Sequence, residues 1–333
     1  MTTIPITLLF ADGASRRIET QAGVSVVAAA TEAGLNLLTD CSNGQCGTCT
    51  ANLVSGGIEL GHYDRAVLPD SDRADGTILT CISQVTEPCV VEFPYDISEA
   101  TAEEPEPIEA RVLSVERVAD ETFRLELEID DALVFEPGQY VRMRPSGGAD
   151  WRSYSMANVP GASKLVFYIR LVEGGSFSTW LSTSAAPGAT LELSHPRGSF
   201  FLRKESRPRL FVAGGTGLAP FLSMLDSIAD REEERAIPTV LLLGVRTGSH
   251  LFAVSQLAAL QEKWPELQLR FAAELDPVEN CHAGYATDLI GSLALGPSTR
   301  VYLCGPPPMV EAGRTAAEAA GVPRKDMLCE RFN

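Results

Sequence analysis

Short runs of alternating apolar and polar residues open the chain and predict strands. Residues 6–13 (ITLLFADG) and 15–23 (SRRIETQAG) form such a pair, with a turn at Asp12-Gly13. Residues 25–35 (SVVAAATEAGL) have apolar spacings of three and four between a serine and a glycine, which predicts a helix. Two further strands, over 50–56 and 78–85, complete a small β-rich unit that we expect to span residues 1–95.

The pattern changes after this unit. Residues 96–109 (DISEATAEEPEPIE) combine acidic, proline and small residues, a composition typical of a linker. Between residues 110 and 205, short alternating strands separated by Gly, Pro and Asp turns predict a closed antiparallel barrel. These strands cover residues 110–118, 122–129, 140–145, 164–172 and 190–196.

Apolar strands and amphipathic helices alternate over residues 206–333. The strands cover 209–215, 239–245, 267–275 and 299–305, and the helices begin near Leu218 and Phe252 and cover 286–294 and 309–321. This alternation indicates a parallel sheet covered on both faces. The sequence therefore predicts a multidomain protein that contains α+β, all-β and α/β domains.

Composition and charge narrow the class of protein. The chain has no apolar run of about eighteen residues, and its amino terminus lacks the pattern of a signal peptide, so we expect a cytoplasmic protein without a membrane partner. The net charge of −17 argues against nucleic-acid and anionic-membrane binding. Residues 1–109 hold seventeen acidic residues against four arginines, and this acidity either steers a basic partner or serves only solubility.

Four of the eight cysteines have the spacing of a metal centre. The pattern is CxxxxCxxC with a further cysteine about thirty residues downstream, which is the plant-type [2Fe–2S] spacing. Gly44 and Gly47 allow the loop to wrap closely around a cluster. A zinc site and unligated thiols are the alternatives, but zinc sites more often use paired CxxC motifs or added histidines. The candidate ligands are Cys41, Cys46, Cys49 and Cys81.

Three further motifs are weak alone and stronger together. Residues 214–220 (GGTGLAP) directly follow an apolar strand and open a helix, which is the placement needed for backbone to approach a pyrophosphate. Residues 304–309 (CGPPPM) end a later strand. Residues 152–155 (RSYS) follow a strand and a glycine-rich turn in the barrel region.

These motifs resemble those of the ferredoxin–NADP reductase superfamily. The resemblance of RSYS to its flavin motif implies that Arg152 meets the flavin phosphate, that Tyr154 packs on the isoalloxazine and that Ser155 approaches the reactive ring nitrogen. Residues 174–180 look like the helix start beneath the pyrophosphate. GGTGLAP and CGPPPM are similar to the nicotinamide-domain signatures, which would place Cys304 beside the nicotinamide ring.

The resemblance supplies the remaining candidate residues. Those implied for the flavin are Arg152, Ser153, Tyr154, Ser155, Ile169, Leu171, Gly175, Phe177, Ser178, Thr179 and the near-terminal Phe332. Those implied for NAD(P) are Gly215, Thr216, Gly217, Arg246, Cys304, Gly305 and Pro306, and the candidate catalytic residues are Ser155, Cys304 and Glu330.

The order of the expected domains narrows the resemblance further. A β-grasp ferredoxin followed by a flavin domain and a nicotinamide domain resembles the reductase components of benzoate, toluate and anthranilate dioxygenases. This implies FAD, a [2Fe–2S] cluster and electron transfer from NADH to a terminal oxygenase, and we expect a monomer. The alternatives are a reductase of a phenol or methane monooxygenase or of another NAD(P)H-dependent system, and a ferredoxin-like carrier with an inactive reductase portion. Arg246 suits NADPH, whereas the resembled reductases mostly use NADH, which we favour.

Overall fold

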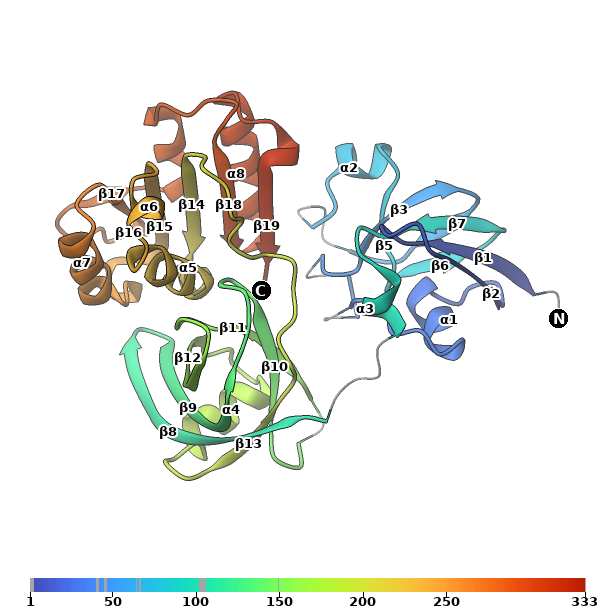
Figure 1. The fold of residues 1–333 in the computed structure, drawn as a ribbon, viewed down its shortest axis with the longest axis horizontal. Helices are drawn as coiled ribbons and strands as arrows, with labels where there is room; N and C mark the ends of the chain where they lie inside the picture. Colours follow the sequence, from blue (N-terminus) through green and yellow to red (C-terminus); the bar gives the residue numbers. More distant parts are fainter. Residues whose placement is uncertain are drawn as a thin grey trace. The chain divides into compact units, whose positions relative to one another are not determined.

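The chain divides into two compact units, of which the first comprises residues 1–104 with 331–333 and the second residues 105–330 (Figure 1). Each unit has its own sheets and its own buried core. The computed structural model describes residues 3–39, 42–44, 47–63, 65, 67–101, 106–148 and 150–332. Two of the predicted cluster ligands, Cys41 and Cys46, lie outside the described residues.

The first unit is built on a small mixed sheet. Its elements are β1 (Ile4–Leu9), β2 (Ser15–Thr20), α1 (Val26–Glu32), β3 (Thr50–Ser55), β4 (Ile58–Leu60), α2 (Asp70–Ala74), β5 (Thr77–Leu79), β6 (Ser83–Val85), β7 (Cys89–Glu92) and α3 (Ile97–Thr101). The strand order is β2-β1-β7-β3-β5, and β4 pairs with β6. Ile6 and Leu8 of β1 are fully buried because alternate residues of a strand face the core. The side chain of Ser25 caps α1 by accepting a hydrogen bond from Ala28 N at 3.2 Å.

Helix α3 lies within the segment whose composition indicated a linker. Ala100 is fully buried, and its carbonyl oxygen accepts a hydrogen bond from Asn36 N at 2.8 Å. The ring of Tyr95 packs on that of Phe93 with centroids 5.3 Å apart, and its hydroxyl accepts a hydrogen bond from Leu38 N at 3.2 Å. Residues up to 101 are therefore anchored to the first unit, because this segment contributes small and aromatic side chains that pack closely.

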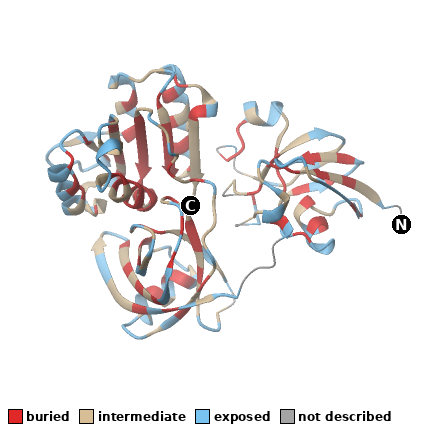
Figure 2. Cartoon of the chain, in the orientation of Figure 1, coloured by how far each residue is buried: buried red, intermediate tan, exposed pale blue. Residues whose placement is uncertain are grey.

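The second unit begins with a curled antiparallel sheet. Its elements are β8 (Ile108–Ala119), β9 (Thr122–Leu133), β10 (Tyr140–Pro145), β11 (Arg152–Ser155), β12 (Ala162–Arg170), α4 (Ser176–Thr183) and β13 (Thr190–Leu193). The order is β11-β10-β13-β8-β9-β12. The chain beyond β11 meets the other end of the sheet, since Ala157 N donates to Val166 O of β12 at 2.8 Å. Leu125, Leu127 and Phe167 are fully buried in the core of this sheet. Figure 2 shows that buried and exposed residues alternate along its strands.

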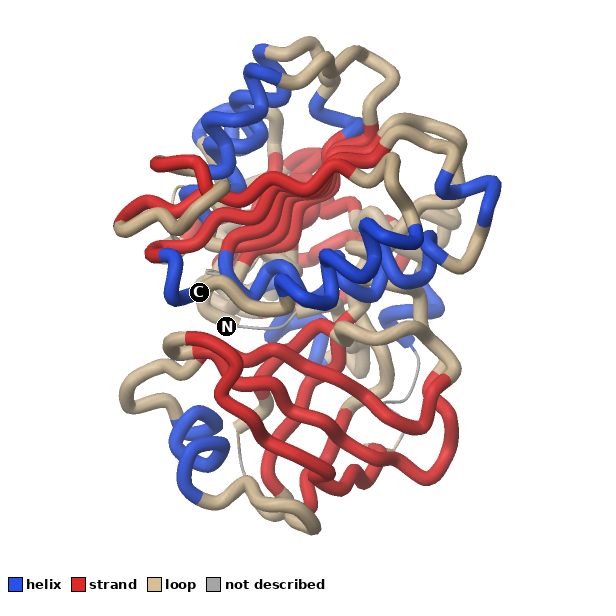
Figure 3. The backbone as a smooth tube through the Cα atoms, turned by 90° about the vertical axis from the view of Figure 1, so that its left-hand side faces the viewer, coloured by secondary structure: helices blue, strands red, loops and turns tan. Residues whose placement is uncertain are grey.

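A largely parallel sheet follows. Its elements are β14 (Arg209–Gly214), η1 (Gly215–Leu218), α5 (Ala219–Ala229), α6 (Glu232–Arg235), β15 (Thr239–Thr247), η2 (Gly248–His250), α7 (Val254–Lys263), β16 (Gln268–Leu275), β17 (Cys281–Ala283), η3 (Ala286–Ser292), β18 (Arg300–Gly305), α8 (Pro307–Ala319), η4 (Arg324–Asp326) and β19 (Met327–Arg331). The strand order is β17-β16-β15-β14-β18-β19, and helices cover both faces (Figure 3). All six residues of β14 are buried, as expected for a central strand.

These observations confirm the predicted fold class. The helix predicted over residues 286–294 is the 3₁₀ helix η3, which follows Gly284 and ends before the turn that leads into β18. The helix predicted from Phe252 begins at Val254. The boundary predicted between the barrel and the parallel sheet at residue 205 stays a prediction. Among the described residues, no helix is long and apolar enough to cross a membrane.

The two sheets of the second unit are joined by specific contacts. Tyr168 of β12 donates a hydrogen bond to Gln256 of α7 at 3.3 Å, and its ring lies 4.7 Å from that of Phe252. The rings of Phe200 and Tyr302 meet edge to face at 5.9 Å. These contacts join the curled sheet and its following loop to the helices and strands of the parallel sheet, in agreement with the single compact unit that residues 105–330 form.

Candidate functional site

Two of the four predicted cluster ligands are described, and they lie together. Cys49 precedes β3 and Cys81 follows β5, and these strands pair antiparallel with Thr50 opposite Leu79. The two sulfur atoms are 3.2 Å apart. Cys49 is buried among Val67 and Leu79, whereas Cys81 is half-buried. These two cysteines are 32 positions apart in the sequence, yet the fold brings their sulfur atoms together. Two sulfur atoms this close in an apolar setting suit the binding of an iron–sulfur cluster by thiolates.

The backbone of the cluster loop has unusual conformations. Ser42, Gly44 and Gly47 have φ values of 55°, 78° and 83°. Gly44 is favoured chiefly by its left-handed φ, and a Cβ there would also press on the end of the Ile82 side chain at 2.9 Å. The Cys49 carbonyl oxygen accepts hydrogen bonds from the Thr80 amide and hydroxyl at 3.0 and 2.9 Å, which fixes one ligand strand to the other.

The RSYS segment is strand β11, at the edge of the curled sheet. Arg152 is exposed, and its guanidinium donates to the Trp151 carbonyl oxygen at 2.8 Å and lies 3.7 Å from an Asp150 oxygen. The ring of Tyr154 lies 5.1 Å from that of Phe177, and burial raises the pKa of its hydroxyl. An exposed arginine beside a half-buried tyrosine suits a ligand that has both a phosphate and an aromatic ring.

The first turn of helix α4 lies beside this strand, since Phe177 of α4 contacts Tyr154 of β11. Ser176 Oγ donates to Asp150 Oδ2 at 3.3 Å, and the amino end of the helix, at Gly175, has no side-chain cap. The hydroxyl of Ser178 accepts a hydrogen bond from Val172 N, and that of Thr179 donates to Gly175 O, both at 2.9 Å. These hydroxyls stabilise the turn, so the backbone N–H groups of the first helical turn are the donors that can face an anion.

The other residues implied for the flavin differ in exposure. Ile169 is fully buried in the interior of the curled sheet, and Leu171 is half-buried against it. Ser153 is half-buried, and Phe332 is half-buried and groups with the first unit. The flavin contacts of all four residues stay predictions.

Ser155, Cys304 and Glu330 meet through one carboxylate. Glu330 Oε2 accepts a hydrogen bond from Ser155 Oγ at 3.2 Å and lies 3.7 Å from Cys304 Sγ. Cys304 is fully buried, and burial together with the Glu330 carboxylate raises the pKa of its thiol well above the usual value. Cys304 is therefore a neutral thiol, whose chemistry is packing and weak hydrogen bonding rather than nucleophilic attack.

The two glycine motifs meet at the carboxyl ends of β14 and β18. These strands are parallel neighbours, with Ala213 opposite Cys304. A Cβ on Gly305 would lie 3.1 Å from Gly214 N and 2.8 Å from Met309 Cε. The strands that follow β14 in sequence, β15 to β17, lie on one side of it, and β18 lies on the other side. The strand order therefore reverses between β14 and β18, and open α/β sheets bind ligands at such a point. The motifs thus form one site, although 90 positions separate the two glycines along the chain.

The remaining residues predicted for NAD(P) surround this point. Gly215 has a φ of 53°, and Gly215, Thr216 and Gly217 lie in η1. Pro306 stands at the amino end of α8. Arg246 is exposed near the end of β15.

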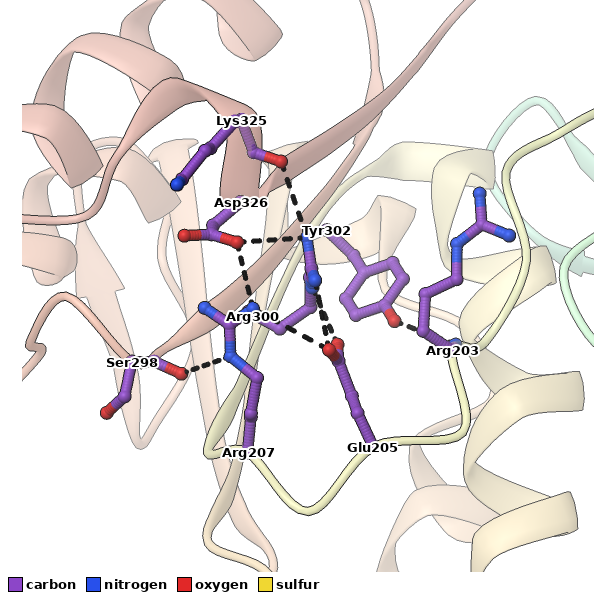
Figure 4. A network of polar contacts seen from close by, with 8 residues as sticks. All are labelled: Arg203, Glu205, Arg207, Ser298, Arg300, Tyr302, Lys325 and Asp326. Atoms are coloured by element: carbon purple, nitrogen blue, oxygen red, sulfur yellow. Dashed lines mark hydrogen bonds and ion pairs between the residues drawn. The ribbon is translucent and has the colours of Figure 1, made fainter. Parts of the chain in front are cut away.

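A charged network that sequence reasoning missed supports β18 and β19 at their amino ends. Arg300 donates to both Glu205 carboxylate oxygens at 2.6 and 2.9 Å, and Arg207 donates to Asp326 at 2.8 Å (Figure 4). The hydroxyl of Tyr302 accepts a hydrogen bond from Arg203 N at 3.0 Å. No motif marks these residues, because they come from segments about 100 residues apart.

Comparison with known proteins first defines a class. Residues 9–86 match the family model of the 2Fe-2S iron-sulfur cluster binding domain, and residues 211–315 match that of the oxidoreductase NAD-binding domain. The chain is therefore an iron–sulfur oxidoreductase that contains an NAD-binding domain.

The relatives then define the family. The anthranilate 1,2-dioxygenase electron transfer component of Acinetobacter baylyi is 34% identical over 98% of this chain and 96% of the relative, and the toluate 1,2-dioxygenase component of Pseudomonas putida is 33% identical over 97% and 96%. A solved structure of the Amycolatopsis cytochrome P450 reductase GcoB superposes with a TM-score of 0.72 at 28% identity, covering 98% of each chain. This chain belongs to the family of ferredoxin-reductase-type electron transfer components. The predicted enzyme class, iron–sulfur cluster and NAD-binding domain are confirmed.

Proposed function

We propose that this chain oxidises NADH and delivers the electrons one at a time to the terminal oxygenase of an aromatic-ring-hydroxylating dioxygenase. The observation that supports this most strongly is the meeting of Ser155 and Cys304 on the Glu330 carboxylate. A serine of the curled sheet and a cysteine of the parallel sheet contact the same carboxylate, so a flavin held by the first sheet and a nicotinamide held by the second would lie next to each other, as hydride transfer requires.

Two cofactors complete the proposal. When bound, FAD accepts a hydride and releases electrons singly, and a [2Fe–2S] cluster accepts one electron at a time. Arg152 and the amino end of α4 would hold the FAD pyrophosphate, and Tyr154 would pack on the ring. Cys41, Cys46, Cys49 and Cys81 would hold the cluster.

The protein's own residues have positioning roles. Gly214 and Gly305 let the two glycine motifs pack closely on each other, because a Cβ at either position would lie within 3.0 Å of a Met309 atom. This close packing would shape the floor of the nicotinamide site. Glu330 accepts a hydrogen bond from the Ser155 hydroxyl and fixes its orientation, so that this hydroxyl would position the flavin when it is bound. Cys304, neutral and buried, shapes the nicotinamide pocket and excludes water.

A second acceptor is supported by a specific observation. The solved structure with a TM-score of 0.72 is a cytochrome P450 reductase, so the same arrangement serves a terminal enzyme of another type. We assign the chain to a dioxygenase because the two curated relatives above serve dioxygenases at higher identity. A cytoplasmic monomer would suit the delivery of electrons to a separate partner protein.

Reconstitution with separate acceptors tests the assignment. The purified holoprotein, NADH and an aromatic substrate are combined with a benzoate-type dioxygenase, a P450 or a di-iron monooxygenase. The expected result is product formation and matched NADH consumption with the dioxygenase. Turnover with only the P450 or the di-iron enzyme would reassign the partner, and NADH oxidation without reduction of any protein acceptor would contradict the proposal.

A further inference from the structure

Arg246 and Glu274 stand beside each other on adjacent strands. β15 and β16 pair in parallel with Val245 opposite Ala273, and the register keeps the same offset through residue 247, which sets Arg246 opposite Glu274. Side chains at matching positions of paired strands point to the same face, and both residues are exposed. A basic and an acidic side chain therefore share the carboxyl edge of the parallel sheet.

The Glu274 carboxylate is fixed in place by Tyr285. The Tyr285 hydroxyl donates a hydrogen bond to Glu274 Oε1 at 3.0 Å, and the backbone N–H of Tyr285 donates to Asp288 Oδ2 at 2.9 Å. The ring of Tyr285 is 55% exposed beside the carboxylate. The edge thus presents a held negative charge next to an accessible aromatic surface.

Other charged groups at this edge do not offset Glu274. Asp276 ends the strand, where its carbonyl oxygen accepts a hydrogen bond from Gly248 N at 3.1 Å. His282 lies 4.0 Å from Asp288, and His250 Nδ1 lies 2.6 Å from Thr247 Oγ1. Glu274, Asp276 and Asp288 outnumber Arg246, so these four residues together carry a net negative charge.

The coenzyme reaches this edge if it binds where the strand order predicts. In open parallel sheets the pyrophosphate lies at the first glycine-rich turn, here residues 214–217, and the adenosine ribose lies at the end of the next strand, here β15. An acidic residue usually occupies that strand end and accepts the ribose hydroxyls, whereas Arg246 there favours a 2′-phosphate. In this chain Glu274, on the neighbouring strand β16, supplies the negative charge that β15 lacks at this position.

We propose that Glu274, held by Tyr285, is the coenzyme-specificity residue of this chain and makes it selective for NADH over NADPH despite Arg246. This inference rests on the proposed oxidation of a nicotinamide coenzyme and adds which one is used. A unit charge about one strand spacing (~5 Å) from a doubly charged phosphate lowers affinity by about tenfold even through water. Arg246 then contacts the ribose and adenine without selecting a phosphate.

The test compares Glu274→Gln with the wild type in two assays. The first is kcat/KM for NADH and NADPH with ferricyanide as acceptor. The second is calorimetric binding of 2′,5′-ADP and of 5′-AMP, which needs no electron transfer. Glu262→Gln on α7 is the matched control, because Glu262 is exposed and lies on a helix away from the carboxyl edge.

The expected result is that Glu274→Gln raises kcat/KM for NADPH by about tenfold and tightens 2′,5′-ADP binding equally, with 5′-AMP binding little changed. Adding Arg246→Gln should remove this gain, since the arginine would then supply the attraction. Glu262→Gln should leave the NADH preference unaltered. An unchanged preference in Glu274→Gln, or a wild type that prefers NADPH, would overturn the proposal.

The two assays also separate this inference from the proposed function. If the wild type oxidises neither coenzyme but still binds 5′-AMP better than 2′,5′-ADP, and Glu274→Gln reverses this order, the specificity role stands and the electron-transfer function fails. If coenzyme oxidation proceeds and Glu274→Gln changes nothing, the function stands and the specificity role fails.

Discussion

The cluster loop of the first unit and the nicotinamide site of the second are positioned in different ways. The loop depends on local backbone conformation, with positive φ angles at Ser42, Gly44 and Gly47 close to the ligands. The nicotinamide site depends on a sheet, because parallel pairing of β14 with β18 brings together two glycine motifs from distant parts of the chain. A local site is damaged by a change to one ligand, whereas a site built from distant strands is sensitive to changes far from it.

The largest expected effect is on the cluster. Cys81→Ser removes a thiolate whose partner sulfur is 3.2 Å away, and we expect loss of the [2Fe–2S] signal and at least ~100-fold slower cytochrome c reduction, since metal sites need their full ligand set. NADH-dependent ferricyanide reduction should persist, because it needs only the second unit. Electron paramagnetic resonance and both assays check this. Cys281→Ser, which changes a half-buried cysteine of the second unit, should retain the cluster.

A smaller effect is expected at the residue that joins the two sheets of the second unit. Glu330→Gln replaces the carboxylate that accepts a hydrogen bond from Ser155. We expect kcat for NADH–ferricyanide turnover to fall by roughly 10- to 100-fold, because small displacements of reacting groups have effects of this size. Stopped-flow absorbance isolates the hydride step. The same change at the exposed Glu279 should have no effect. Unaltered hydride transfer in Glu330→Gln would remove this residue from the site.

Close backbone approach predicts the next effect. Gly305→Ala would place a methyl group 3.1 Å from Gly214 N and 2.8 Å from Met309 Cε. We expect the KM for NADH to rise by about tenfold with a smaller change in kcat, since the strands must separate and the coenzyme would lose about 1.4 kcal/mol of binding. Gly291→Ala is the control, because its Cβ would meet open space. A normal KM in Gly305→Ala would contradict the nicotinamide assignment.

The smallest effects concern stability. Glu205→Gln leaves the half-buried Arg300 without its bidentate partner and should lower the free energy of unfolding by about 1–2 kcal/mol. Glu128→Gln breaks only an exposed 3.8 Å pair with Arg111 and should cost at most ~0.5 kcal/mol. Thermal unfolding of the holoprotein compares the two variants. Equal losses would mean that the network in Figure 4 is no more than a surface feature.

The same network predicts a pH dependence. Hydrogen bonds from Arg300 lower the pKa of Glu205, and hydrogen bonds from Arg207 lower the pKa of Asp326. Stabilisation by a carboxyl whose folded pKa is lowered is complete above its unfolded pKa and is lost as the pH falls through its folded pKa. The difference in thermal midpoint between the wild type and Glu205→Gln should therefore shrink as the pH falls below ~4.5. A difference that grows on acidification would contradict this assignment.

Local patterns in the sequence predicted much of this molecule. The hairpin of β1 and β2, the helix capped by Ser25 and the alternating strands and helices beyond residue 206 follow from apolar spacing and turn residues. The cysteine spacing predicted the cluster domain because ligands of one loop are close in sequence.

Features that depend on distant contacts could not be derived in this way. Glu330 joins Ser155 across 175 residues, and only the resemblance to a known family suggested it. Helix α3 was missed because acidic and small residues dominate its segment, whereas the buried Ala100 and the Tyr95 hydroxyl anchor it. The pairing of Arg246 with Glu274 requires the register of two strands, which no local pattern contains.

In the proposed function, NADH reduces the cluster of the first unit through a flavin held by the second. Anaerobic titration of the holoprotein with NADH, followed by visible absorption and low-temperature electron paramagnetic resonance, tests it most directly. We expect NADH to cause loss of the flavin bands, bleaching of the cluster absorption and a rhombic iron–sulfur signal, with little response to NADPH at the same concentration. Flavin reduction that leaves the cluster oxidised, although dithionite reduces it, would contradict electron transfer between the two units.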